Sequence, residues 1–345
     1  MAFKSLFRVM DKISLSSGYS MPVLGLGTWQ ATPEVVRDAV LSALEIGYRH
    51  IDTAYNYKNE AAIGEALQEW LKQEGNRRED IFITTKLPHY ANRPSDVAVY
   101  LQKSLNDLGL SYVDLYLVHM PFTMKANEAG DAPALAEDGT VLLEQSDHLA
   151  VWREMEKQVS EGRVHSIGIS NFNQRQVERL CNEASVAPAC LQLEMHAALQ
   201  QQQMRDVCVS KNIALTAFSP LGSPGSKQHF KSKYQLEFTC PDLLSNETVL
   251  QLSKKHQRSP AQILLRHLVQ LGAAVIPKST SPLRLKENFE IFNFNLSDDE
   301  MSEMEKLDIG HKGRIINFLF FKGQVPHILS IIIFSSTYCL KYLLY

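Results

Sequence analysis

Short apolar runs alternate along this chain with segments whose apolar residues recur every three or four positions. Apolar runs of four to eight residues are typical of buried strands, and the wider spacing is typical of amphipathic helices. Eight runs fit strands, at 23–26, 49–52, 81–86, 113–119, 164–170, 189–194, 214–218 and 274–277. This alternation predicts a parallel sheet whose faces are covered by helices.

Four of the intervening segments carry clear helix boundaries. A serine or threonine stands near the start of three of them, and a glycine ends or follows each one. The four segments are 32–47, 95–109, 149–162 and 259–272. Eight strand–helix units that close on themselves form a (β/α)8 TIM barrel, which is the predicted fold class. An open, doubly wound sheet is the alternative.

Three further features divide the chain. Residues 12–20, with Ser17 and Gly18 in the middle, predict a β-hairpin before the first barrel strand. Residues 122–145 are too long for a tight turn and predict a functional loop. We therefore expect an N-terminal extension at 1–11, a barrel domain at 12–323 and a divergent hydrophobic tail at 324–345.

The two ends of the chain have unusual compositions. The first ten residues contain Lys4 and Arg8 and no acid, which indicates a short extension or, alternatively, a weak mitochondrial presequence. Residues 328–345 are mostly apolar, with Lys341 as their one charge. A helix of that length spans about 27 Å, which is marginal for a membrane core. We expect a tail that packs on the protein or an aberrant end, with a tail anchor as the alternative.

Composition excludes several classes of protein. The chain has 35 lysines and arginines against 38 acids, a net charge of −3, which excludes a broadly basic nucleic-acid-binding protein. Hydrophobic residues make up 45% of the chain and charged residues 21%, so wholesale disorder is excluded. The five cysteines form no CxxC pair or zinc-type spacing, so we expect no metal site and a reducing, cytoplasmic location.

Polar residues stand at or just after the ends of most predicted strands. Each one alone fits a helix cap, a solvated charge or a satisfied core residue. In a barrel, however, the carboxyl ends of all strands meet at the face that carries the chemistry, so together they predict an active site. These residues are Asp52, Lys86, His119, Ser170, Asn171, Gln192, Ser219 and Lys278.

Tyr57 follows Asp52 by five residues, in the loop after the second strand. A phenol is a weak acid, and a neighbouring ammonium lowers its pKa. Asp52 could aim Lys86 at Tyr57, and His119 could orient a carbonyl oxygen. This set predicts general acid catalysis, in which Tyr57 protonates an oxygen that becomes an alkoxide. Without Lys86 and His119, Tyr57 would be interpreted as a surface aromatic residue.

A nucleotide site is indicated after the last strand. The glycine pair in LGLGTW lacks the third glycine of a GxGxxG fingerprint, and the chain contains no P-loop. The segment IPKSTSPLRLKEN instead brings Lys278, Ser279, Thr280 and Arg284 to a place where barrels often bind phosphate. Two cations and two hydroxyls suit a 2′-phosphate, although a solvated helix start is an equal alternative from this segment alone.

Six separated segments resemble the motifs of the aldo-keto reductase superfamily, in content, order and spacing. The segments are GYRHIDTAYNYKNEAAIG (47–64), ITTKL (83–87), DLYLVHMP (114–121), SIGISNFN (166–173), AFSPLGS (217–223) and IPKSTSPLRLKEN (276–288). The resemblance extends from about residue 12 to about residue 323. It implies a TIM barrel that reduces aldehydes or ketones with NADPH.

The resemblance also implies residue roles. Tyr57 would be the proton donor, Lys86 would lower its pKa, Asp52 would support Lys86, and His119 would orient the carbonyl. The residues expected to bind NADPH/NADP+ are Ser170, Asn171, Gln192, Phe218, Ser219, Leu221, Ser223, Lys278, Ser279, Thr280, Arg284 and Asn288. The residues expected in the substrate pocket are Trp29, Asn56, His119 and Met120.

The chain departs from the family pattern at several of these positions. Phe218 replaces a common tyrosine, Met120 a common tryptophan, and Pro88 another frequent aromatic residue. The family pattern ends after INFLFFKG, where relatives carry a segment that selects substrates. The prediction is a monomeric NADP-dependent oxidoreductase acting on small carbonyl compounds. The alternative is a catalytically weak or inactive NADP(H)-binding barrel that acts as a binding or sensor subunit.

Overall fold

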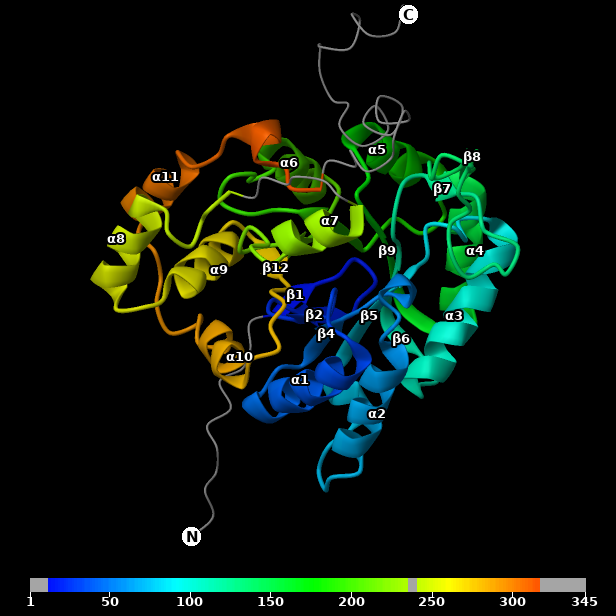
Figure 1. The fold of residues 1–345 in the computed structure, drawn as a ribbon, viewed down its shortest axis with the longest axis horizontal. Helices are drawn as coiled ribbons and strands as arrows, with labels where there is room; N and C mark the ends of the chain where they lie inside the picture. Colours follow the sequence, from blue (N-terminus) through cyan, green and yellow to red (C-terminus); the bar gives the residue numbers. More distant parts are fainter. Residues whose placement is uncertain (1–11, 235–240, 317–345) are drawn as a thin grey trace, which may run out of the picture.

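Eight parallel strands form the centre of the molecule in the computed structural model, which describes residues 12–234 and 241–316 (Figure 1). Their order in the sheet is β12-β11-β10-β9-β6-β5-β4-β3. The strands are β3 (Leu26–Gly27), β4 (His50–Asp52), β5 (Phe82–Leu87), β6 (Val113–Val118), β9 (Val164–Ser170), β10 (Cys190–Glu194), β11 (Ala214–Phe218) and β12 (Ala273–Val275). The predicted barrel class is therefore confirmed.

The first and last strands meet through a few backbone contacts. Leu24 forms a parallel bridge with Val275, and the Gly25 amide donates to the Val275 carbonyl at 2.9 Å. These contacts close the sheet into a barrel. They also explain why β3 begins at Leu26 rather than at residue 23: residues 23–25 pair through single contacts instead of a continuous ladder. By contrast, β9 and β11 occupy their predicted ranges.

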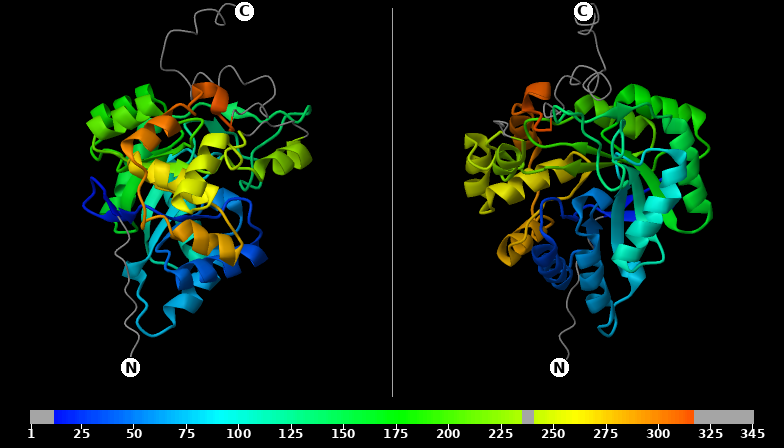
Figure 2. Two further views of the ribbon diagram at one scale, coloured as in Figure 1. Left: turned by 90° about the vertical axis from the view of Figure 1, so that its left-hand side faces the viewer. Right: turned by 45° about the vertical axis from the view of Figure 1, so that its right-hand side comes forward.

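Helices surround the strands on the outside (Figures 1 and 2). They are α1 (Pro33–Ile46), α2 (Glu60–Leu71), α3 (Pro94–Leu108), α4 (His148–Ser160), α5 (Gln174–Glu183), α6 (Gln202–Ser210), α7 (Ser226–Tyr234), α8 (Glu247–His256), α9 (Pro260–Gln270), α10 (Pro282–Phe289) and α11 (Asp298–Glu305). The helix predicted from Ser95 begins one residue earlier, at Pro94, whose fixed φ suits a first helical position. Gly47 and Gly109 end α1 and α3 with positive φ, as predicted.

The predicted N-terminal hairpin is present as β1 (Lys12–Ser14) and β2 (Ser20–Pro22). Its apolar residues Leu15 and Met21 pack with Phe82, Ala189 and Ala214, which lie at or beside the amino ends of barrel strands. The hairpin therefore closes the amino end of the barrel. Any site that needs access to solvent must lie at the opposite end, where the strands terminate.

The predicted long loop after β6 contains a small antiparallel pair, β7 (Thr123–Met124) and β8 (Leu143–Glu144). Three short 3-10 helices complete the described structure, η1 (Tyr55–Tyr57), η2 (Arg78–Asp80) and η3 (Gly310–Gly313). The predicted extension at 1–11 and tail at 324–345 lie outside the described residues. Among the described residues, no helix is long and apolar enough to cross a membrane.

Candidate active site

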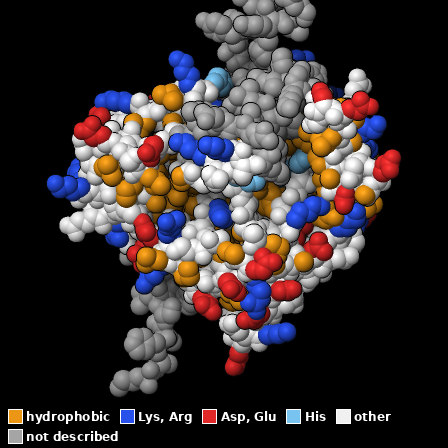
Figure 3. Space-filling view, in the orientation of Figure 1, with side chains coloured by type: hydrophobic (Ala, Val, Ile, Leu, Met, Phe, Trp, Pro, Cys, Tyr) orange, Lys and Arg blue, Asp and Glu red, His pale blue; other side chains and the backbone are white. Residues whose placement is uncertain are grey.

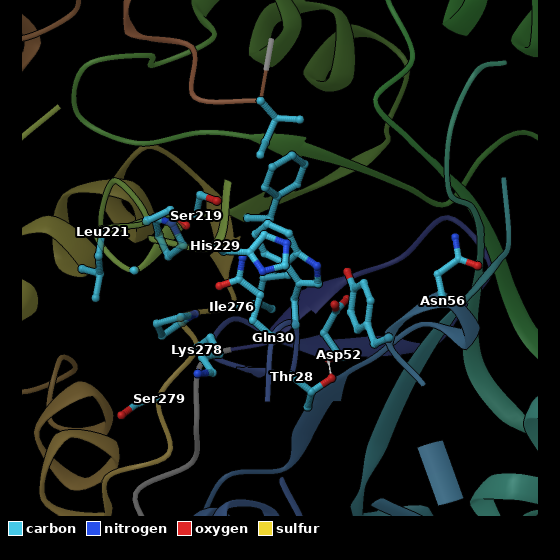
Figure 4. Close-up of a pocket in the computed structure, with 18 of the residues that line it drawn as sticks. Thr28, Gln30, Asp52, Asn56, Ser219, Leu221, His229, Ile276, Lys278 and Ser279 are labelled. Carbon is cyan, nitrogen blue, oxygen red and sulfur yellow. Dashed lines mark hydrogen bonds between the residues drawn. The ribbon is translucent and has the colours of Figure 1, made fainter. Parts of the chain in front are cut away.

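A cavity of about 1510 Å³ opens at the carboxyl ends of the strands. In Figure 3 this face is hollowed near its centre, with hydrophobic and histidine side chains around the hollow. Figure 4 shows that Asn56 and Asp52 lie toward one side of the cavity, and that Leu221, Lys278 and Ser279 lie toward the other. The fold thus gathers residues from across the sequence around one elongated space.

The cavity is lined by every residue that the sequence analysis placed in a site, with the exception of Lys86. Lys86 is wholly buried beneath the cavity floor, with none of its surface exposed. It points from the end of β5 (Phe82–Leu87) toward the end of β4 (His50–Asp52). An ammonium in such a place must be neutralised by its neighbours.

Lys86 has two partners on the adjacent strand end. Its Nζ donates to Asp52 Oδ1 at 2.6 Å and to the Thr53 carbonyl at 2.8 Å. Nζ also lies 5.2 Å from the centre of the Tyr57 ring. An ammonium has three protons to donate and no lone pair. The nearby Tyr57 hydroxyl and the Asp52 carboxylate both favour the charged form of Lys86 and raise its pKa.

The chemistry of Lys86 limits how it can act on the Tyr57 hydroxyl. Because an ammonium can only donate, a hydrogen bond between the two must be accepted by the Tyr57 oxygen. The proton of Tyr57 is then available to an acceptor in the cavity that Tyr57 lines. The His119 ring lies edge-on to the Tyr57 ring, with 5.8 Å between the ring centres. The four predicted catalytic residues therefore converge at one end of the cavity.

Opposing effects set the pKa of Tyr57. Burial and the charge of Asp52 raise it, while Lys86 lowers it, and the net pKa lies above the usual value of 10.0. Lys86 therefore acts on the pKa in the predicted direction, but burial outweighs it. Tyr57 consequently keeps its proton at neutral pH, as a general acid must.

His119 is held in its neutral form. Burial lowers its pKa well below the usual value of 6.5, and the charges of Lys86 and His89 lower it further. Its Nδ1 atom is buried and has no hydrogen-bond partner in the described part of the chain. A neutral imidazole carries one N–H, which can donate to a carbonyl oxygen without competing as an acid.

Side-chain amides line the same end of the cavity. Gln192 Nε2 donates to Asp52 Oδ2 at 2.7 Å, so Asp52 is held by both Lys86 and Gln192. Asn171 Nδ2 lies 3.1 Å from the His119 carbonyl and 3.1 Å from Ser170 Oγ. Ser170 and Gln192 are also neighbours across the β9–β10 pair. These amides and the exposed face of Phe218 would suit a flat, amide-bearing ring.

The opposite end of the cavity carries the predicted cations and hydroxyls. Lys278, Ser279, Thr280 and Arg284 all line it, together with Asn288. Burial lowers the pKa of Lys278, and Lys278 forms no ion pair with any residue in the described ranges. An ammonium at the cavity wall without an acidic partner is suited to an anionic ligand.

The loop between β11 and α7 (Ser226–Tyr234) connects the two ends. Ser219 and Ser223 both adopt positive φ, at 53° and 47°, so the chain turns tightly around Leu221. Beyond the turn, His229 and Phe230 of α7 contact Trp29, with 5.6 and 6.4 Å between ring centres. Figure 4 shows the His229 ring projecting toward Gln30. Helix α7 thus forms a wall of the cavity.

The sequence analysis missed several cavity residues. Most of them lie on long connections or beyond the last predicted helix, where no apolar period or strand end marks them. They include Gln30, Lys58, His89, Asp131, His229, Phe230, Glu287 and Ile316. His89 could have been found from its place two residues after the β5 strand end. Nothing in the sequence marks Ile316.

Comparisons with known proteins agree with this geometry. The model of the Aldo/keto reductase family matches residues 23–309. Aldo-keto reductase family 1 member A1 of Bos taurus is 43% identical over 298 residues, which cover 86% of this chain and 89% of the relative. The Gallus gallus protein of the same name is 41% identical over 300 residues, with the same two coverages. The solved aldose reductase from Schistosoma japonicum matches with a TM-score of 0.84 at 39% identity, over 95% of this chain and 100% of that chain.

Proposed function

The chain belongs to the aldo/keto reductase family, and from this premise we propose that it reduces aldehydes and ketones to alcohols with NADPH. The observation that carries the proposal is the series of side-chain contacts from Asp52 through Lys86 to Tyr57, which lies at the cavity beside His119. Proteins of this family are oxidoreductases that act on small carbonyl compounds.

The lining of the cavity fits the cofactor by the chemistry of its donors. Lys278 and Arg284, with the hydroxyls of Ser279 and Thr280, would hold the phosphorylated adenosine end. Ser219 and Ser223 would lie along the pyrophosphate, with Leu221 between them. Phe218, Asn171 and Gln192 would hold the nicotinamide end. Lys278 and Arg284 are the reason for proposing NADPH rather than NADH, because a 2′-phosphate adds two negative charges.

NADPH, when bound, supplies the hydride for the carbonyl carbon. His119 donates a hydrogen bond that orients the carbonyl oxygen, and Tyr57 transfers its proton to that oxygen as negative charge develops there. Lys86 stabilises the resulting phenolate through its third N–H, and Asp52 keeps Lys86 charged and fixed. Trp29, Asn56 and Met120 would contact the rest of the substrate from the cavity wall.

Replacement of Tyr57 by phenylalanine tests the proposal. Tyr57→Phe keeps the ring and removes the proton that is transferred to the carbonyl oxygen, so turnover of a reactive aldehyde with NADPH should fall about a hundred- to ten-thousandfold. NADPH binding, followed by quenching of protein fluorescence, should persist. Tyr55→Phe is the matched control, because Tyr55 packs against Tyr100 and does not line the cavity.

Two outcomes would contradict the proposal. Unchanged turnover in Tyr57→Phe would remove Tyr57 from the role of general acid. NADPH binding by the wild-type protein without oxidation across a panel of aldehydes and ketones would point instead to the binding or sensor subunit. The same panel run with NADH tests the proposed cofactor preference.

A further inference from the structure

Glu194 is a buried carboxylate at the active-site end of the barrel that the proposed chemistry does not use. It is the last residue of β10 (Cys190–Glu194) and has no exposed surface. It does not line the cavity, although Gln192, two residues earlier, does. A wholly buried carboxylate is costly unless its lone pairs are satisfied, so its partners indicate its purpose.

Those partners are two consecutive backbone amides near the end of the described chain. Glu194 Oε1 accepts from the Ile315 amide at 2.6 Å, and Oε2 accepts from the Ile316 amide at 2.8 Å. His196 Nε2 lies 3.2 Å from Oε1. Both carboxylate oxygens of Glu194 therefore bind the backbone of residues 315–316. Short, charge-assisted bonds of this kind are among the stronger hydrogen bonds in proteins.

The surrounding charges keep Glu194 ionised. Burial alone would raise its pKa, but the hydrogen bond from His196 and the charge of Arg314 outweigh burial, so the pKa lies below the usual value of 4.5. Burial lowers the pKa of Arg314, and the charge of Glu194 opposes that effect. The buried Glu194 carboxylate thus lies between the His196 ring, to which it is hydrogen-bonded, and the positive charge of Arg314.

The same segment is fitted closely to the loop that follows β10. The Ile309 amide donates to the Ala198 carbonyl at 3.2 Å, and Gln200 Nε2 donates to the Met304 carbonyl at 2.8 Å. Gly313 lies so near the Ala198 backbone that a side chain at residue 313 would collide with it. The segment 309–316 therefore follows this loop toward the end of β10.

The bonds of Glu194 bring Ile316 to the cavity. Ile315 is completely buried, and Ile316 lines the cavity. Glu194 is the register partner of Phe218 across the β10–β11 pair, and adjacent strands lie about 4.8 Å apart. The backbone of Ile316 is thereby bound next to the strand end that carries Phe218, the residue proposed to face nicotinamide.

We propose that Glu194 is a positioning residue that binds the amides of Ile315 and Ile316, and so sets how far Ile316 projects into the substrate end of the cavity. Glu194 thereby determines which carbonyl compounds fit, without touching them. This inference rests on the proposed function, since it concerns the substrate of the same site. Glu194 would thus affect substrate selectivity although it does not line the cavity.

The test compares Glu194→Gln and Glu194→Asp with the wild-type protein. The carboxamide introduced by Glu194→Gln would turn a donor toward a backbone N–H, and the aspartate keeps the charge but is too short to reach both amides. We measure kcat and KM with NADPH for propanal and for 4-nitrobenzaldehyde. The ratio of the two KM values should change by about tenfold or more, since one misfitted methylene is worth ten- to two-hundredfold in such pockets. If one of the two variants does not fold, the KM ratio is measured on the other.

A matched control and a double variant separate positioning from general stability. Glu156 also accepts from two consecutive backbone amides, those of Ser185 and Val186 at 2.8 and 2.7 Å, but lies away from the cavity. Glu156→Gln should leave the KM ratio unchanged. In an Ile316→Ala background, Glu194→Gln should change the ratio less than about twofold, because the residue that it positions is gone.

Tryptic cleavage after Arg314 gives a readout independent of turnover. Release of the segment in Glu194→Gln should speed this cleavage about tenfold relative to the wild type, while Glu156→Gln should not, since a charge-assisted hydrogen bond is worth at least that factor. Unchanged cleavage, or an unchanged KM ratio in an active enzyme, would overturn the inference. Wild-type protein that binds NADPH but reduces no carbonyl would overturn the proposed function instead, and faster cleavage would still support the role of Glu194 in binding the segment.

Discussion

Glu60 illustrates how a single buried group affects stability without entering the chemistry. It begins α2 and is 3% exposed. Its carboxyl accepts hydrogen bonds from Thr85 Oγ1 at 2.5 Å and Ser104 Oγ at 2.7 Å. Burial raises its pKa from 4.5 to about 7, although both hydrogen bonds oppose this effect. The folded protein therefore prefers Glu60 protonated over a range where the unfolded chain does not.

This difference predicts a pH-dependent stability. Because the folded pKa is raised, the contribution of Glu60 is fully present below pH 4.5 and is lost as the pH rises through about 7. The loss should approach about 3 kcal/mol of unfolding free energy, at 1.36 kcal/mol for each pKa unit. Glu60→Gln, which is neutral throughout, should lack this loss. Urea unfolding of both proteins at pH 5 and pH 8.5 measures it.

The control for this prediction is Glu65→Gln, at an exposed position of the same helix. It should follow the wild-type dependence on pH. If the stabilities of the wild type and Glu60→Gln ran parallel between the two pH values, the titration of Glu60 would not contribute to them.

For single residues, sequence position predicted the cavity residues at or near strand ends, and it missed many that lie on more distant loops and helices. Asp52, Lys86 and His119 stand at or beside strand ends, and the barrel places all strand ends on one face, so sequence position was enough. His229 and Ile316 reach the cavity only because α7 and the segment after α11 pack over it. Such packing depends on contacts far apart in the sequence, which no local pattern records.

The contact between α2 and α3 depends on one glycine. Gly64 lies within α2 (Glu60–Leu71), directly against the C-terminal end of α3 (Pro94–Leu108). A Cβ atom there would lie 2.9 Å from the Leu108 Cα and would also meet the backbone of Asp107. Backbone atoms cannot move aside as a flexible side chain can, so the two helices would have to separate.

Gly64→Ala should therefore destabilise the protein, although alanine is the better helix former. The gain in helix propensity is about 1 kcal/mol, whereas overpacking against a rigid neighbour costs about 1–3 kcal/mol and can exceed that. We expect a lower midpoint of thermal unfolding. Gly225→Ala is the control, because a Cβ at Gly225 meets no atom within 4 Å. A midpoint above that of the wild type would show that the helices adjust without cost.

Elements were predictable in proportion to the apolar surface that they bury. The strands β6 and β11 are buried almost throughout, and apolar residues fill most of their positions in the sequence. The short polar helices show no clear apolar pattern in the sequence. Helix α5 buries only Val177 and Leu180, and Met304 is the one apolar residue that α11 buries. One or two apolar residues do not define a helical period.

The cavity couples the stability of the whole molecule to its ligand. Lys278, on the connection between β12 and α10, lines the cavity without an acidic partner among residues 12–234 and 241–316. Burial disfavours the charged form of Lys278, and a bound phosphate would offset this cost by stabilising the ammonium. A ligand that binds only the folded state raises the free energy of unfolding by RT ln(1 + [L]/Kd).

NADPH should consequently stabilise the protein more than NADH does, and Lys278 should account for much of the difference. At one hundred times its Kd, NADPH would add about 2.7 kcal/mol to the free energy of unfolding, which appears as a higher thermal midpoint. In Lys278→Met the gain from NADPH should shrink toward the gain from NADH, because the methionine offers no charge to the 2′-phosphate. Lys286→Met is the control, since Lys286 is exposed on α10 and does not line the cavity. If Lys278→Met kept the full difference between the two nucleotides, Lys278 would not contact the 2′-phosphate, and the preference for NADPH would have to come from Arg284 and the neighbouring hydroxyls.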